Sequence, residues 1–395
     1  MKKGTTWVVA VISAILGGAP LDAAGSVSRS CPPSRSRPEL AAEKTALVQI
    51  AILLDTSNSM DGLIDQARTQ LWSIVNQFAA ARRYGQAATL QVALYEYGNS
   101  RLTPQSGYVR RLLPFTTDLD RVSQELFALT TQGGDEFCGT VMQAALDQLA
   151  WSPSPAALKV IFIAGNEPFT QGETDYHNAV PVAVKKNIVI NTIFCGNKDE
   201  GEKTNWKDGA VLGEGAYANI DQNESAPPIA TPHDADLSTL SSQLNGTYLA
   251  YGRRAEEGKA RQSEQDSNAS SVAPAAAAAR SVSKASGFYK NSSWDLVDAL
   301  EEKTVELKDV AKDDLPKEMQ SMTLEQREAH VKKLADQRKD VQSKIASLEV
   351  KRQAYIAAER LKQTNSSTTS TLGEALLKAV REQATRKGYT FDATK

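Results

Sequence analysis

LVQIAILL, residues Leu47–Leu54, runs directly into DTSNS, residues Asp55–Ser59. A run this apolar predicts a strand that is buried on both faces, as strands of a parallel sheet are. After the polar loop, apolar side chains recur at helical spacing through Gly62–Tyr84. The members of that stripe are Leu63, Ala67, Leu71, Ile74 and Phe78. A buried strand, a tight polar loop and an amphipathic helix form the first unit of an α/β domain.

The same alternation continues down the chain. Further strands are predicted at Leu90–Tyr97, Tyr108–Leu113, Leu158–Ala164, Ile188–Phe194 and Ala216–Ile220. Helices are predicted at Asp118–Leu129, Thr140–Trp151, Asp175–Lys186 and Ala235–Leu244. Strands separated by helix-length connections predict a doubly wound, Rossmann-like domain with a mainly parallel sheet and helices on both faces. In such sheets, ligands bind outside the carboxyl ends of the strands.

The first residues have the pattern of a secretory signal peptide, which we predict over residues 1–25 in preference to a buried helix. Lys2 and Lys3 precede the uncharged apolar run Trp7–Leu16, and Ala23–Gly25 offers small residues for cleavage. That run is too short to span a bilayer comfortably, and no later stretch is apolar enough. We therefore expect a bacterial periplasmic or secreted protein with no stable membrane span after cleavage. A disordered linker is expected over residues 26–45.

The composition changes after Gly252, which ends the expected α/β domain of residues 46–252. Residues 253–290 are polar and Ala-rich and predict a partly helical linker. Residues 291–395 predict a helical, coiled-coil-like region. Three helices begin there at the capping residues Ser292, Thr323 and Thr371.

The longest of these helices is expected from Leu324 to about Leu361. Its apolar side chains keep a seven-residue repeat that Arg338 and Arg352 interrupt, so we expect weaker packing than in a regular coiled coil. The pattern fits an antiparallel hairpin with a helix over Trp294–Val310, a coiled coil with a second chain, or a solvated helix. In each case the region is a structural or partner-binding module, and an oligomer through these helices is one outcome.

Composition and motifs argue against two classes of function. The formal net charge is −2, and no Lys/Arg cluster offers the basic surface that nucleic acid requires. The three histidines are far apart in the chain, and Ser57 lies in no Gly-x-Ser-x-Gly elbow. No Gly-rich stretch has the spacing of a phosphate or dinucleotide loop. We therefore predict that the protein is not an enzyme.

The cysteines are interpreted in the light of the expected export. Cys138 and Cys195 both fall inside the α/β domain, whereas Cys31 falls in the linker. In an oxidising compartment a Cys138–Cys195 disulfide could stabilise the fold by about 3–4 kcal/mol, and two unpaired buried thiols are the alternative. No Cys/His cluster indicates structural zinc.

Asp55, Ser57 and Ser59 are the first candidate ligands. They follow a buried strand with a spacing of two, so that one carboxylate and two hydroxyls point to one side of a tight loop. Hard oxygen donors favour Mg²⁺, with Mn²⁺ and Ca²⁺ as alternatives. Helix capping alone could also explain these residue types.

Two later loops favour the metal site. Gly133–Thr140 is a Gly-rich loop that ends in a hydroxyl just before a helix, and Ala164–Pro168 leaves the strand expected beside the first one. All three loops would meet at one edge of the sheet.

At this point the sequence resembles the von Willebrand factor type A (VWA) domain family, over about Leu47–Gly252. The resemblance implies a metal-ion-dependent adhesion site (MIDAS) in which Asp55, Ser57, Ser59 and Thr140 match the family pattern. The family usually has an aspartate in a third loop, where this chain has Gly165 or Asn166, followed by Glu167. Asn166 could orient a metal-bound water and Glu167 could supply the missing charge. The alternative is a degenerate site that keeps the fold alone.

The resemblance therefore implies a non-enzymatic, extracytoplasmic binding or adhesion protein. A divalent cation would engage a protein partner whose carboxylate completes the coordination. The alternative is an envelope scaffold or assembly factor that acts through its C-terminal helices and has a degenerate metal site.

Overall fold

The computed structural model describes residues 46–79, 81–220, 229–363 and 372–391. The predicted signal peptide (1–25) and linker (26–45), with Cys31, lie outside the described residues. No helix within the described ranges has the length and apolarity needed to cross a membrane.

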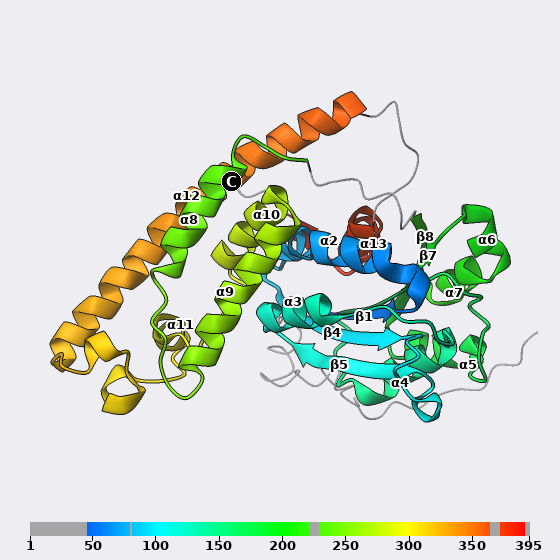
Figure 1. The fold of residues 1–395 in the computed structure, drawn as a ribbon, viewed down its shortest axis with the longest axis horizontal. Coiled ribbons are helices and arrows are strands. Elements are labelled where there is room, and N and C mark those ends of the chain that lie inside the picture. Colours follow the sequence, from blue (N-terminus) through cyan, green and yellow to red (C-terminus); the bar gives the residue numbers. More distant parts are fainter. Residues whose placement is uncertain (1–45, 80, 221–228, 364–371, 392–395) are drawn as a thin grey trace, which may run out of the picture.

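A six-stranded sheet forms the centre of the α/β part (Figure 1). In spatial order it contains β5 (Val109–Thr116), β4 (Thr89–Tyr97), β1 (Leu47–Asp55), β6 (Leu158–Gly165), β7 (Val189–Cys195) and β8 (Glu214–Ile220). All neighbours are parallel except the edge strand β5, which runs antiparallel to β4. The chain winds in one direction from β1 to β5 and in the other from β6 to β8, so the switch point lies between β1 and β6. Crevices at such switch points are where open α/β sheets bind ligands.

Helices cover both faces of this sheet. The clusters of buried side chains place α2 (Asp61–Ala79) and α3 (Leu119–Ala128) on one face. On the other face lie α4 (Cys138–Gln148), α5 (Tyr176–Lys185) and α7 (Trp206–Leu212), while the short α6 (Lys198–Lys203) precedes α7. The predicted Rossmann-like fold with a mainly parallel sheet is confirmed.

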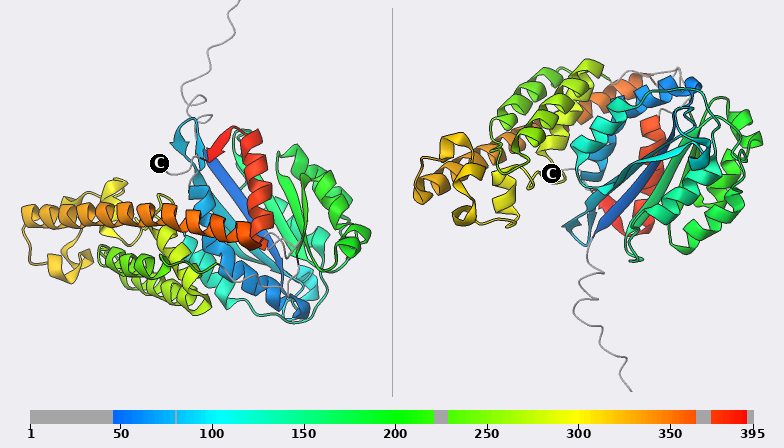
Figure 2. Two further views of the ribbon diagram at one scale, coloured as in Figure 1. Left: turned by 90° about the horizontal axis from the view of Figure 1, so that it is seen from above. Right: turned by 60° about the horizontal axis from the view of Figure 1, so that its bottom comes forward.

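The last described segment also belongs to the α/β part. α13 (Leu372–Arg386) packs beside α2 on the sheet (Figure 2). β9 (Tyr389–Phe391) pairs with β2 (Ala81–Arg83) in a small second sheet that β3 (Gln86–Ala87) completes. The sequence pattern had placed residues 291–395 in one helical region, because an amphipathic helix does not reveal which surface it covers.

The remaining helices form an elongated lobe beside the α/β part (Figure 1). They are α8 (Asp234–Asn245), α9 (Ala255–Val272), α10 (Pro274–Ala285), α11 (Leu296–Glu301) and α12 (Leu324–Gln363). Short 3₁₀ turns at Leu307–Asp309, Lys312–Asp314 and Lys317–Met319 connect α11 to α12. The Ala-rich stretch that was expected as a linker forms α9 and α10. Its small side chains let α10 pack closely on α2, where Asn76 Nδ2 donates to the carbonyl of Ala279 at 2.9 Å.

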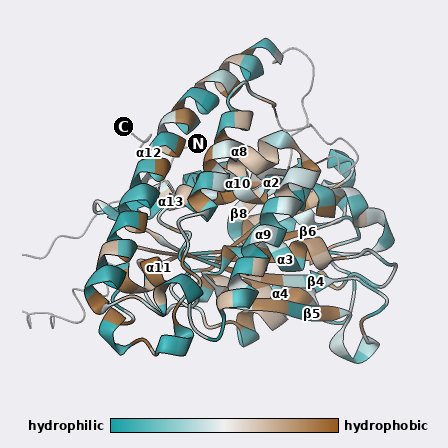
Figure 3. Cartoon of the chain, turned by 60° about the vertical axis from the view of Figure 1, so that its left-hand side comes forward, coloured by the Kyte–Doolittle hydropathy of each residue, from teal (hydrophilic) through white to brown (hydrophobic). Residues whose placement is uncertain are grey.

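The long helix α12 packs within its own chain, against α8, α10 and α11. Arg338 and Arg352 do not interrupt its buried seam, because each is only 4% exposed and is paired there with acidic residues of other elements. Arg338 Nη1 contacts Asp295 at 2.8 Å and Asp298 at 2.7 Å, and Arg352 Nε contacts Asp234 at 3.0 Å. The opposite side of α12 is largely hydrophilic (Figure 3).

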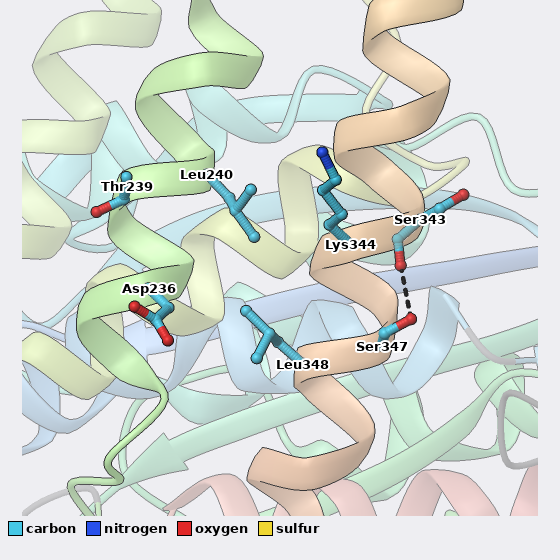
Figure 4. A pocket seen from close by; sticks show the side chains of 7 residues that line it. All are labelled: Asp236, Thr239, Leu240, Ser343, Lys344, Ser347 and Leu348. Atoms are coloured by element: carbon cyan, nitrogen blue, oxygen red, sulfur yellow. Dashed lines mark hydrogen bonds between the residues drawn. The ribbon is translucent and has the colours of Figure 1, made fainter.

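An open groove of about 500 Å³ lies between α8 and α12 (Figure 4). Leu240 and Leu348 face each other across it, and Asp236 and Lys344 provide charge on opposite sides. The lobe therefore has a partly apolar furrow between α8 and α12.

Candidate metal site

Asp55 lies at the carboxyl end of β1, beside the switch point, and its side chain is fully buried. Its Oδ1 accepts a hydrogen bond from the backbone N–H of Ser57 at 2.8 Å. Its Oδ2 has no hydrogen-bond partner among the described residues. Burial, together with smaller contributions from the nearby Glu136 and Glu167, raises the pKa of Asp55 to about 8, against the lowering effect of Ser57. An unpartnered, buried carboxylate oxygen is costly unless a cation or proton satisfies it.

Three further predicted residues gather next to Asp55. Ser57 Oγ and Ser59 Oγ are 3.3 Å apart, and Asn166 Nδ2 donates to Ser59 Oγ at 3.2 Å. Asn166 Oδ1 is buried without a hydrogen-bond partner among the described residues. The loops after β1 and β6 therefore meet at the switch point, as the sequence predicted.

The two remaining predicted residues, Thr140 and Glu167, differ in whether they lie near the candidate site. The Thr140 hydroxyl donates to Thr174 Oγ1 at 3.1 Å, in the loop before α5. The backbone carbonyl of Glu167 accepts a hydrogen bond from Trp206 Nε1 at 2.8 Å, and its carboxylate raises the pKa of Asp55. Glu167 is thus near the candidate site, whereas the described hydrogen bond of the Thr140 hydroxyl leads away from it.

Glu136 is a site residue that the sequence analysis missed. It is only 7% exposed and lies in the Gly-rich loop before α4. Burial, with a smaller contribution from the charge of Glu167, raises its pKa to about 7, against the lowering effect of the nearby Ser57 side chain. The loop before α4 therefore contributes a carboxylate to the site.

Two glycines make this close approach feasible. A Cβ at Gly98 would lie 2.7 Å from Cγ of Glu136 and 2.8 Å from Oδ1 of Asp55. A Cβ at Gly165 would lie 2.5 Å from the Tyr97 hydroxyl and 3.1 Å from Oδ2 of Asp55. Side chains at either position would fill the space beside the carboxylates. This crowding explains why position 165, at the end of β6, has no acidic side chain.

The residues present fit a hard divalent cation. The donors are carboxylate, hydroxyl and amide oxygens, and a cation would satisfy the unpartnered Asp55 Oδ2 and offset the repulsion between Asp55, Glu136 and Glu167. Among the described residues, no group of three or more His, Cys, Asp or Glu side chains forms a metal cluster. A cation here would therefore depend on the Ser57, Ser59 and Asn166 oxygens as well.

The two cysteines of the α/β domain do not form a disulfide in this structure. Cys138 and Cys195 are both free and buried. The side chain of Cys138 packs in the cluster with α4 and α5, and that of Cys195 packs in the cluster on the α2 face. Because the two side chains lie on opposite faces of the sheet, the disulfide prediction is wrong for this structure. Burial raises the pKa of both thiols, so they are poor nucleophiles.

The buried carboxylates predict a pH dependence of stability in the absence of added cation. The folded-state pKa of Asp55 is raised from 3.8 to about 8 and that of Glu136 from 4.5 to about 7, so the folded protein retains protons that the unfolded chain releases. The stability from these groups is present below their unfolded pKa values and is lost as the pH rises through the folded ones. We expect urea denaturation in EDTA to show Asp55→Asn gaining stability relative to the wild type over this range. A difference that does not change with pH would contradict the prediction.

With this geometry the molecule belongs to the class of doubly wound α/β domains with polar oxygen atoms gathered at the switch point of the sheet. Residues 49–206 match the family model of the von Willebrand factor type A domain. These residues therefore form a VWA domain, and the prediction of that domain is confirmed.

Three solved structures illustrate the likeness. BatB from Bacteroides thetaiotaomicron is 16% identical, with a TM-score of 0.34 over 44% of this chain and 90% of that one. The SpRpn10 VWA domain is 17% identical, with a TM-score of 0.33 over 46% of this chain and 91% of that one. Proximal thread matrix protein 1 from the mussel byssus is 14% identical, with a TM-score of 0.34 over 45% of this chain and 42% of that one, less than half of its length. No curated protein matches the chain. Likeness at this level concerns the fold alone.

Proposed function

We propose that this protein is a cation-dependent interaction module. VWA domains commonly serve in protein–protein interaction or adhesion and are typically non-enzymatic. The observation that carries the cation is the buried Asp55 Oδ2, which has no hydrogen-bond partner among the described residues and lies beside Ser57, Ser59 and Asn166. Mg²⁺ suits this set of oxygens best, with Mn²⁺ or Ca²⁺ as alternatives.

In this proposal each residue has a defined part. Asp55 binds the cation directly, and the Ser57 and Ser59 hydroxyls contribute neutral oxygens from the same loop. Asn166 and Glu167 act from the loop after β6, and Thr140 is the remaining hydroxyl implied by the family pattern. The bound cation supplies a concentrated positive charge, so an acidic side chain of a protein partner could complete its coordination.

The first test is thermal stability of the full chain with magnesium, manganese, calcium or EDTA. A cation at a hundredfold excess over its Kd should stabilise the wild type by about 2.7 kcal/mol. Asp55→Ala should abolish this stabilisation because it removes the buried anionic ligand. Asp65→Ala is the matched control, because the Asp65 side chain is 70% exposed on α2, and it should leave the shift unchanged. If none of the three cations stabilises the wild type relative to EDTA, the metal component of the proposal is refuted.

We also propose that the protein acts outside the cytoplasm, in the periplasm or after secretion. The support is the signal-peptide pattern of residues 1–25, with Lys2 and Lys3 ahead of an apolar run. Fractionation of the native host would test it. Recovery of the uncleaved chain in the cytoplasm would contradict it.

A second candidate is a scaffold that acts through the helical lobe. Exposed apolar side chains in the C-terminal half of α12 favour a scaffold, since Val350 is 51% exposed and Leu361 is 78% exposed. Partner capture that survives Asp55→Ala, but is lost in a double variant with Val350→Glu and Leu361→Glu, would favour the scaffold. Loss of capture in Asp55→Ala alone would favour the interaction module.

A further inference from the structure

We propose that Glu136, in the loop before α4, is a cation ligand, and that Thr140, in the first turn of α4, is not. This inference rests on the proposed cation site and changes its ligand set. It assigns a residue that the family pattern does not indicate, since the pattern implies the neutral hydroxyl of Thr140.

The first observation is the position of the Glu136 carboxylate. The Ser57 side chain lies close enough to Glu136 to lower the pKa of its carboxyl, and its Oγ is 3.3 Å from Ser59 Oγ. Glu136 is therefore next to the loop after β1. Cγ of Glu136 and Oδ1 of Asp55 both adjoin Gly98, where a Cβ would lie within 2.8 Å of each. The two carboxylates thus share one small space at the end of the sheet.

The second observation is the position of Thr140. Its hydroxyl donates to Thr174 Oγ1 at 3.1 Å, and its methyl group lies where a Cβ at Gly107 would approach within 2.7 Å. Both contacts hold Thr140 against the loops before β5 and α5. The described contacts of Thr140 therefore support a packing role.

The third observation is the balance of charge. Glu136 is buried near Glu167 and Asp135, which raise its pKa, and it forms no ion pair with a Lys, Arg or His of the described residues. A buried carboxylate without a positive partner is destabilising, unless a cation is bound beside it. The unpartnered Asp55 Oδ2 independently indicates a missing cation in the same space.

Glu136 also supplies a negative charge that the loop after β6 lacks at the position of the family's aspartate. Asn166 is neutral where the family usually has an aspartate, and Gly165 is too crowded to be replaced by one. With Asp55 and Glu136 as ligands, the protein has two negative charges to match one divalent cation. Hard divalent cations bind more tightly as the number of charged oxygen ligands rises.

Calorimetric titration of the full chain with Mg²⁺ tests the assignment. Glu136→Gln keeps the shape of the side chain and removes its charge, and we expect it to weaken Mg²⁺ binding at least about tenfold. Thr140→Val keeps the packing and removes the hydroxyl, and we expect a change of less than about twofold. Asp55→Asn should abolish binding and reports on the site as a whole.

Thermal denaturation in EDTA distinguishes a lost ligand from a damaged fold. Glu136→Gln removes one of several mutually repelling carboxylates, so its melting temperature in EDTA should equal or exceed that of the wild type. The same variant should lose the Mg²⁺-dependent rise in melting temperature. A ligand role predicts these two changes together, and a purely structural role does not.

The outcomes separate this inference from the proposed function. If the wild type binds no cation, the proposed function fails and Glu136 as a ligand fails with it. If Asp55→Asn abolishes binding while Glu136→Gln binds Mg²⁺ like the wild type, only the assignment of Glu136 is wrong. A loss of binding in Thr140→Val would likewise overturn the preference for Glu136.

Discussion

Arg280→Met should lower the free energy of unfolding by about 3–5 kcal/mol, because it leaves a buried carboxylate without its positive partner. Arg280 is 1% exposed on α10, and its guanidinium lies 4.4 Å from the centre of the Trp72 ring in α2. It forms ion pairs with Asp120 of α3 and, at 2.9 Å, with Asp266 of α9. One side chain therefore joins the helical lobe to the α/β part.

The loss of stability in Arg280→Met should come mainly from the Asp120 carboxylate, which is only 3% exposed and would be left without its positive partner. Asp266 keeps the Lys284 ammonium at 2.6 Å, whereas Asp120 would retain, among the described residues, only the Tyr289 hydroxyl at 2.6 Å. Adding Asp120→Asn to Arg280→Met should therefore recover part of the lost stability. Urea denaturation of both variants measures this effect.

Lys332→Met is the control for Arg280→Met. Lys332 is 77% exposed and pairs with Asp336 along α12, so its replacement should cost less than about 1 kcal/mol. A loss for Arg280→Met that is no larger than this would show that the lobe does not depend on the buried ion pair.

The second large effect is expected at α13. Val380 is 2% exposed and lines a small apolar cavity of about 40 Å³ between the sheet, α2 and α13, together with Leu376 and Phe162. Val380→Asp would place a carboxyl among apolar side chains that offer it no hydrogen bond, which should cost at least about 3 kcal/mol. Urea denaturation and the soluble yield of the variant measure this cost.

Lys378→Asp is the matched control for Val380→Asp. It introduces the same residue two positions earlier, on the exposed side of α13, and should change stability by no more than about 0.5 kcal/mol. If both variants behave alike, α13 does not form part of the core of the α/β domain.

Most of the central sheet could be predicted from local pattern alone. β1 and β6 are continuous apolar runs because parallel strands are covered by helices on both faces. The place of α13 could not be predicted, since its apolar stripe fits any apolar surface. The sequence pattern predicts that Arg338 and Arg352 interrupt a coiled coil, because their acidic partners lie on α8 and at α11, far away in the sequence.

In the candidate site, too, residues that are adjacent in the chain could be predicted, whereas the contribution of a separate loop could not. Asp55, Ser57 and Ser59 are adjacent in the chain, so their spacing alone brings their oxygens together. The choice between Glu136 and Thr140 depends on how the loop before α4 folds, and no repeating pattern governs that. The signal that could have indicated Glu136 is a pair of acidic residues directly after Gly133-Gly134 in the sequence.

The pairing of β9 with β2 has a consequence for the order of events during synthesis. Arg83 Nε donates to the carbonyl of Lys387 across a separation of 304 residues. The α/β domain obtains its last strand and covering helix only after the whole helical lobe has been translated. Until α13 has been translated, the part of the sheet beside α2 that this helix covers stays exposed, and we expect the α/β domain to complete its folding only after that point.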